Sequence, residues 1–101
     1  MVGAEAFCLT DLLEILREQR ETGMRMAEDV PRMLADPEIT TEQIKTLFKA
    51  LEKQAEFTEN LAGVLEEGGF DFEIIKAAEN LEDLYAELAA AVAELLAKRG
   101  G

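Results

Sequence analysis

Histidine is absent from the sequence, and this absence removes several classes of chemistry at once. Without an imidazole there is no Ser-His-Asp or Cys-His nucleophile, no phosphotransfer through histidine and no zinc site of the usual kinds. The Glu-x-x-His pattern of di-iron bundles is excluded for the same reason. Glycine-rich loops of the GxGxxG or GxxxxGK[ST] type, which hold phosphates, are also missing. No cofactor is therefore expected.

Cysteine and basic residues are both scarce. Cys8 is the only cysteine, so no disulfide can form within the chain, and a reducing compartment, the cytoplasm, is expected. The 10 Lys and Arg residues are outnumbered by 22 Asp and Glu residues, which gives a net charge of −12 at pH 7. A field of this sign repels phosphate backbones and anionic lipids, so neither nucleic acid nor a membrane is an expected partner. A basic protein or peptide is compatible with it.

Long uninterrupted apolar runs are missing as well, and apolar residues recur instead at helical spacing. No stretch approaches the roughly 18 consecutive apolar residues that would indicate a membrane-spanning helix. The most regular stripe lies in residues 74–96, at steps of three or four residues. It consists of Ile74, Ala78, Leu81, Tyr85, Leu88, Val92, Leu95 and Leu96. This period predicts an amphipathic helix with one continuous apolar face.

Capping signals set the ends of three predicted helices. The expected ranges are about 11–34, 41–67 and 72–98. Thr40 and Gln43 have the spacing of a capping box, and Asp11 and Asp71 are the expected N-caps of the other two helices. Pro31 should kink the last turn of the first helix or begin a separate short turn, because it lacks an N–H group.

Three helices of similar length joined by short turns predict an all-α, up-down-up antiparallel three-helix bundle. Residues 1–101 are expected to form a single domain, because a chain of this length supports one small core. A second apolar stripe on the third helix suggests that the bundle self-associates into a larger helical bundle.

A polar interruption is predicted in the middle of this bundle. Counted at 100° per residue, Arg20 falls near the centre of the first helix's apolar stripe. Gln54, Thr58 and Tyr85 lie at the same height on the other two helices. Two interpretations remain open: a hydrogen-bonded layer that fixes the register of the helices, or a pocket for a small ligand held by Arg20.

Four carboxylates allow a different interpretation. Glu56-x-x-Glu59 on one helix, followed by Glu79 and Asp83 on the next, resembles the paired acidic motifs of all-helical MazG-type nucleoside-triphosphate pyrophosphohydrolases. The resemblance covers about 30 residues and implies a magnesium site; it departs at Asn80, where the second motif has a glutamate. Glu56 and Asp83 point away from the bundle interior, so a shared metal would require two subunits.

The remaining surface features favour contacts between proteins. A stripe of alanines on the third helix and a group of apolar side chains near the first exceed the needs of a thin core. The expected interface comprises Ala86, Ala89, Ala90, Ala93, Ala97, Met26, Met33, Phe7 and Leu9. The sequence thus predicts a non-enzymatic interaction or adaptor module that forms a homodimer and has an acidic rim suited to basic partners. The alternatives are the magnesium-dependent hydrolase and a small-ligand sensor built on Arg20.

Overall fold

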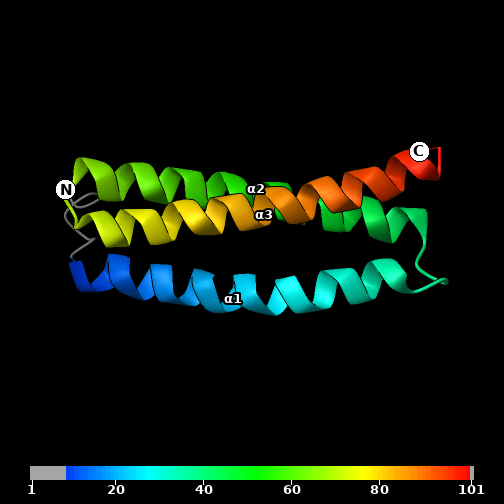
Figure 1. Cartoon of the computed structure of the whole chain (residues 1–101), viewed down its shortest axis with the longest axis horizontal. Helices are drawn as coiled ribbons and strands as arrows, with labels where there is room; N and C mark the ends of the chain where they lie inside the picture. Colours follow the sequence, from blue (N-terminus) through cyan, green and yellow to red (C-terminus); the bar gives the residue numbers. More distant parts are fainter. Residues whose placement is uncertain (1–8, 101) are drawn as a thin grey trace.

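The structure, a computed structural model, describes residues 9–100 and is all-helical over that range, with no strand (Figure 1). Helix α1 spans Leu9–Ala35, α2 spans Thr41–Glu67 and α3 spans Phe72–Lys98. The predicted all-α fold with three helices is confirmed. Cys8 lies outside the described residues. Of these helices, none combines the length and the apolar character that crossing a membrane requires.

Both ends of α2 follow from local sequence. The Thr40 hydroxyl oxygen accepts a hydrogen bond from the N–H of Gln43 (3.0 Å), and the Gln43 side-chain oxygen accepts one from the N–H of Thr40 (2.9 Å). These are the two bonds of the predicted capping box. At the other end, Gly69 adopts the left-handed conformation (φ 73°), and the N–H of Phe70 donates to the Leu65 carbonyl. This Schellman motif ends the helix.

The beginning of α1 differs from the predicted cap, whereas that of α3 agrees with it in position. Helix α1 starts at Leu9, so Asp11 lies inside the first turn and is not the N-cap. A carboxylate in the first turn still interacts favourably with the helix dipole. An aspartate near the start of a helix is therefore favourable both as the N-cap and inside the first turn. Asp71 is the N-cap residue of α3, as predicted, although its side chain makes no capping hydrogen bond. Pro31 lies within α1, which continues through it to Ala35.

The inward face of each helix follows alternating steps of three and four residues. In α1 these inward residues are Leu12, Leu16, Gln19, Gly23, Met26 and Val30. In α2 they are Ile44, Leu47, Leu51, Gln54, Thr58, Leu61 and Leu65. In α3 they are Ile74, Ala78, Leu81, Tyr85, Leu88, Val92 and Leu95. All are buried or half-buried, so the core has the 3.5-residue period of coiled coils.

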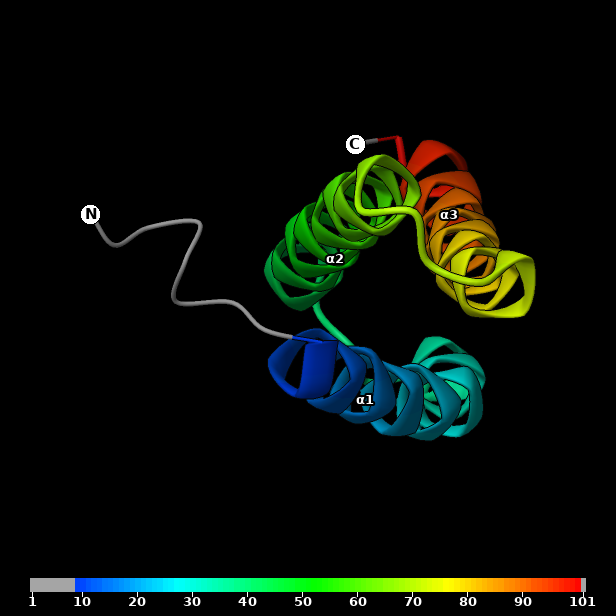
Figure 2. The ribbon, with the colours of Figure 1, turned by 90° about the vertical axis from the view of Figure 1, so that its left-hand side faces the viewer.

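Helices α2 and α3 form the tighter pair, and α1 lies across from them. Close backbone approach is most extensive between α2 and α3, smaller between α1 and α3, and smallest between α1 and α2. Figures 1 and 2 show this pairing from the side and along the bundle. The Arg99 guanidinium, just after α3, donates to the Ile39 carbonyl (2.7 Å), just before α2. This bond fixes the end of α3 beside the beginning of α2.

Candidate functional site

Arg20 is not part of the interior. The structure places it on the exposed surface of α1, and Gln19 occupies the inward position instead. The expectation for Arg20 is wrong because buried Leu12, Leu16, Gly23 and Val30 set the centre of the inward face. At 100° per residue, Gln19 lies closer to that centre than Arg20 does.

The polar layer exists, but it is uncharged. Tyr85 is buried, and its hydroxyl donates to the backbone carbonyl of Gln19 (3.2 Å). The hydroxyl of buried Thr58 donates to the carbonyls of Gln54 (2.9 Å) and Ala55 (3.0 Å) in its own helix. Burial raises the pKa of Tyr85 above its ordinary value, so the phenol stays neutral at physiological pH. Tyr85 and Gln19 are thus joined between α3 and α1, while the hydrogen bonds of Thr58 stay within α2, and the guanidinium of Arg20 takes part in none of these bonds.

The most distinctive surface feature is a groove between α2 and α3, here called the acidic groove, with a volume of about 620 Å³. Its apolar lining consists of Phe48, Ala55, Ala86, Ala89, Ala90 and Ala93. Its polar lining consists of Glu52, Glu56, Glu59 and Glu82. The lining contains no Lys or Arg. Small side chains on α3 thus leave an apolar trough beside four carboxylates.

The surroundings of Glu82 in the acidic groove disfavour its negative charge. Desolvation raises the pKa of Glu82 most, and the nearby charges of Glu59, Asp83 and Glu79 raise it further. Because each of these groups is negative, ionised Glu82 lies in an unfavourable field. A cation placed in the groove would relieve that repulsion, so the site favours positive charge.

The four carboxylates of the predicted metal site lie in one region of the surface, two on α2 and two on α3. Glu56 and Glu59 line the acidic groove, whereas Glu79 and Asp83 lie on α3 near Glu82. Over residues 9–100, no group of three or more Cys, Asp or Glu side chains is close enough to hold a metal ion. The paired acidic motifs thus lie in one region of the surface without forming a cation-binding cluster there.

The residues predicted to form one interface are divided between several places. The acidic groove contains four of them, namely Ala86, Ala89, Ala90 and Ala93. Ala97 is exposed beyond the groove, while Met26 is half-buried against the core. Met33 is 41% exposed and lines a different groove beside Ile39 and the start of α2. Phe7 and the side chain of Leu9 lie outside what the structure describes.

Sequence reasoning named Glu56 and Glu59 only as possible metal ligands, and it did not place them with Glu52 beside the alanines of α3. Glu52, Glu56 and Glu59 follow one another at steps of four and three along α2. Ala86, Ala90 and Ala93 show the same steps along α3. The glutamate stripe and the alanine stripe have the same steps, and each lies beside the inward face of its helix. This match is the sequence signal that could have indicated that the two stripes lie together. Glu82 and Phe48, which complete the groove, carry no such signal.

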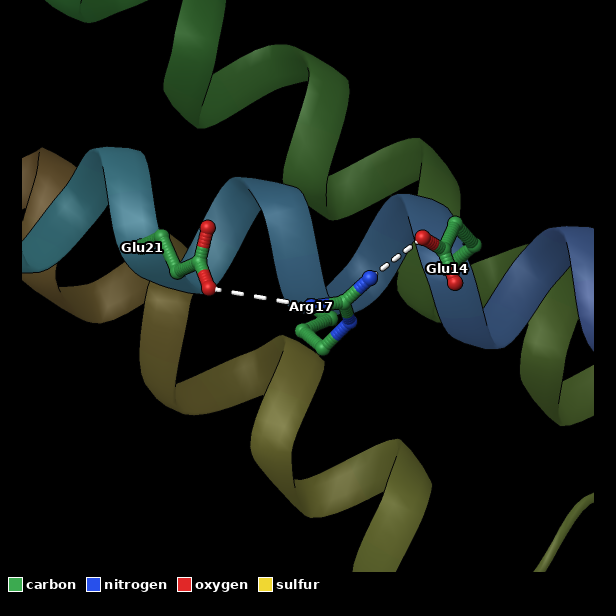
Figure 3. Close-up of polar contacts among 3 residues, drawn as sticks. All are labelled: Glu14, Arg17 and Glu21. Carbon is green, nitrogen blue, oxygen red and sulfur yellow. Dashed lines mark hydrogen bonds and ion pairs between the residues drawn. The ribbon is translucent and has the colours of Figure 1, made fainter.

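A smaller concavity lies between α1 and α2. It is lined almost entirely by apolar groups, from Leu12, Ile15, Phe57, Asn60, Leu61 and Val64, and has a volume of about 190 Å³. Phe57 and Val64 remain 43% and 49% exposed. The face of α1 that carries Arg17 is charged instead: its guanidinium pairs with Glu14 and Glu21 (Figure 3). These pairs mark a solvent-exposed face.

The fold and the acidic groove define the molecule as an all-helical bundle with one anionic, alanine-lined face. Comparison with known proteins adds no relative: no family model, no curated protein and no solved structure matches the chain.

Proposed function

We propose that this chain is a non-enzymatic protein–protein interaction module, and that the acidic groove is its binding surface. The observation that carries the proposal is the combination of an alanine-lined trough with four glutamates and no basic side chain. The proposal includes an up-down-up order of the helices and a cytoplasmic location. It describes an adaptor whose specificity comes from helix packing and charge.

Alanine supports this function for a geometric reason. The distance between two packed helices depends on the size of the side chains at their contact, and small residues allow the closest approach. Ala86, Ala90 and Ala93 lie at helical spacing along the groove, so another helix could pack against them without displacing large side chains. Docking of an amphipathic helix into a groove is a common recognition mode.

The glutamates select the charge of the partner. Glu52, Glu56 and Glu59 flank one side of the trough, and Glu82 lies on the other helix. A partner helix with alanines on its inner face and Lys or Arg beside them would complement both features. Complementary charge raises the association rate and rejects acidic competitors more than it increases affinity. A basic helical segment is thus the preferred partner.

Self-association is the second candidate, supported by the same alanines. Two copies packed face to face through the acidic groove would form a helical bundle larger than three helices. Such a dimer brings two sets of four glutamates together, so it must overcome like-charge repulsion. The two candidates therefore respond differently to salt, because screening weakens repulsion in the dimer and attraction to a basic helix.

The test uses a helical lysine–alanine peptide of about 20 residues as the probe. We expect it to bind the wild-type protein in fluorescence anisotropy and an Ala90→Trp variant at least tenfold more weakly, since an indole would fill the trough. Ala91→Trp is the matched control, because Ala91 is also exposed on α3 but does not line the groove.

Equal binding to both tryptophan variants would contradict the proposal. So would binding of a glutamate–alanine peptide as tight as that of the lysine–alanine peptide. Circular dichroism of each variant, with a melting temperature close to that of the wild type, checks that the bundle is intact.

A further inference from the structure

Helix α1 is the least tightly packed of the three helices. Seven large side chains in the described part of the chain are less than 2% exposed, and of these only Val30 belongs to α1. The others come from α2 and α3 and include Tyr85, Ile44 and Leu51. Close backbone approach between α1 and α2 is also the least extensive of the three pairs. The packing free energy is thus concentrated in the α2–α3 pair.

The middle of the inward face of α1 contributes little apolar packing. Its inward residues there are Gln19 and Gly23, neither of which has a large apolar side chain. The side-chain oxygens of Gln19 and Gln54 are buried, and neither has a hydrogen-bond partner within the described residues. A buried acceptor without a partner opposes burial, because water would satisfy it. Release of α1 would hydrate both oxygens.

Few polar contacts hold α1 in place. Over residues 9–100, the hydrogen bond from the Tyr85 hydroxyl to the Gln19 carbonyl is the one side-chain bond that joins α1 to another helix. The ion pairs of Arg17 with Glu14 and Glu21 stay within α1 (Figure 3) and would survive its release. The connection after α1 is instead held from α3, where Arg99 donates to the Ile39 carbonyl.

We propose that α1 is a detachable helix, which releases as a unit while α2 and α3 stay paired. The release pivots in residues 36–38, because Ile39 is buried and is fixed by Arg99. It uncovers the inward face of α3 around Leu81 and Tyr85, a surface distinct from the acidic groove. The bundle therefore contains a built-in conformational switch between a closed and an open state, and this inference does not depend on the proposed partner.

Native-state hydrogen–deuterium exchange on the full chain, followed by mass spectrometry, tests this directly. Amides of α1 are expected to exchange at least tenfold faster than the most protected amides of α2 and α3. In a Tyr85→Phe variant, α1 protection should fall about fivefold further, because the bond to Gln19 is lost. Protection in α2 and α3 should stay unchanged until the global unfolding limit.

A second variant moves the equilibrium in the opposite direction. Gln19→Leu replaces a buried oxygen without a partner by an apolar group of similar size, so α1 protection should rise about tenfold. Arg20→Leu is its matched control, since Arg20 is the exposed neighbour and should leave α1 protection unchanged. A single protection level shared by all three helices would overturn the proposal, as would a Tyr85→Phe effect of equal size in all three.

Discussion

Single residues decide what the polar layer and the acidic groove can do. Gln19 and Arg20 are neighbours in sequence, yet one lies in the core layer and the other in solvent. Had the arginine occupied the inward position, the layer would have carried a charge suited to an anionic ligand. Tyr85, Thr58 and Gln54 instead form an uncharged layer, whose physical effect is on the packing of α1.

Glu82 provides a prediction about pH. Its pKa is raised above 4.5, first by desolvation and then by Glu59, Asp83 and Glu79. The fold therefore prefers protonated Glu82, so its contribution to stability is present at low pH and is lost as pH rises through the raised pKa. Glu82→Gln, which resembles the protonated form, should raise the free energy of unfolding at pH 7 by about 0.5 kcal/mol, the size typical of interactions between solvent-exposed charges.

Urea denaturation at pH 7 and at pH 3.5 measures this effect. The gain from Glu82→Gln should be present at pH 7 and absent at pH 3.5, where the wild-type carboxyl is protonated in both folded and unfolded states. Glu87→Gln, an exposed carboxyl on the same helix, controls for the loss of one negative charge. A larger gain at pH 3.5 than at pH 7 would contradict the assignment.

At the scale of the helices, two glycines have opposite roles. Gly63 lies within α2 with nothing within 4 Å of the position of an added Cβ. Gly23 lies within α1, where an added Cβ would be 2.9 Å from a Leu81 methyl carbon and 3.4 Å from the Tyr85 hydroxyl. The first glycine weakens its helix without any packing benefit, whereas the second allows α3 to approach α1.

Replacing each glycine by alanine should separate these roles. Gly63→Ala should raise the free energy of unfolding by about 1 kcal/mol, the difference in helix propensity. Gly23→Ala gains the same propensity, but crowding against Leu81 and Tyr85 costs about 1 to 3 kcal/mol, so a net loss is expected. Chemical denaturation monitored by circular dichroism gives both values. Equal stabilisation by both substitutions would show that α1 and α3 do not approach closely at Gly23.

The helices themselves were well predicted from sequence, and their inward faces less so. The capping box of Thr40 and Gln43 and the glycine turn after α2 depend on neighbouring residues, so local sequence determines them. Selection of Gln19 over Arg20 depends on which side of α1 the other two helices cover, which is a property of the packed bundle. The acidic groove depends on which stripe of α2 lies beside which stripe of α3. No single helix contains that information.

For the whole molecule, net charge governs association. The chain carries −12 at pH 7, so two copies repel one another at low ionic strength. We expect sedimentation velocity to show self-association that strengthens between about 20 mM and 500 mM salt, where the Debye length falls from roughly 20 Å to about 4 Å. Binding of the lysine–alanine peptide should weaken over the same range. A dimer that dissociates as salt rises would instead indicate an interface of opposite charges.

The hydrogen bond from Arg99 to the Ile39 carbonyl has a mechanical consequence. It joins the residue that follows α3 to the connection between α1 and α2, although the two residues are 60 positions apart in sequence. A pulling force applied to the end of α3 would thus load this connection before it unwinds the helix. In a single-molecule stretching experiment, the bond would act as a clamp at one end of the bundle, and Arg99→Ala would lower the force of the first extension event.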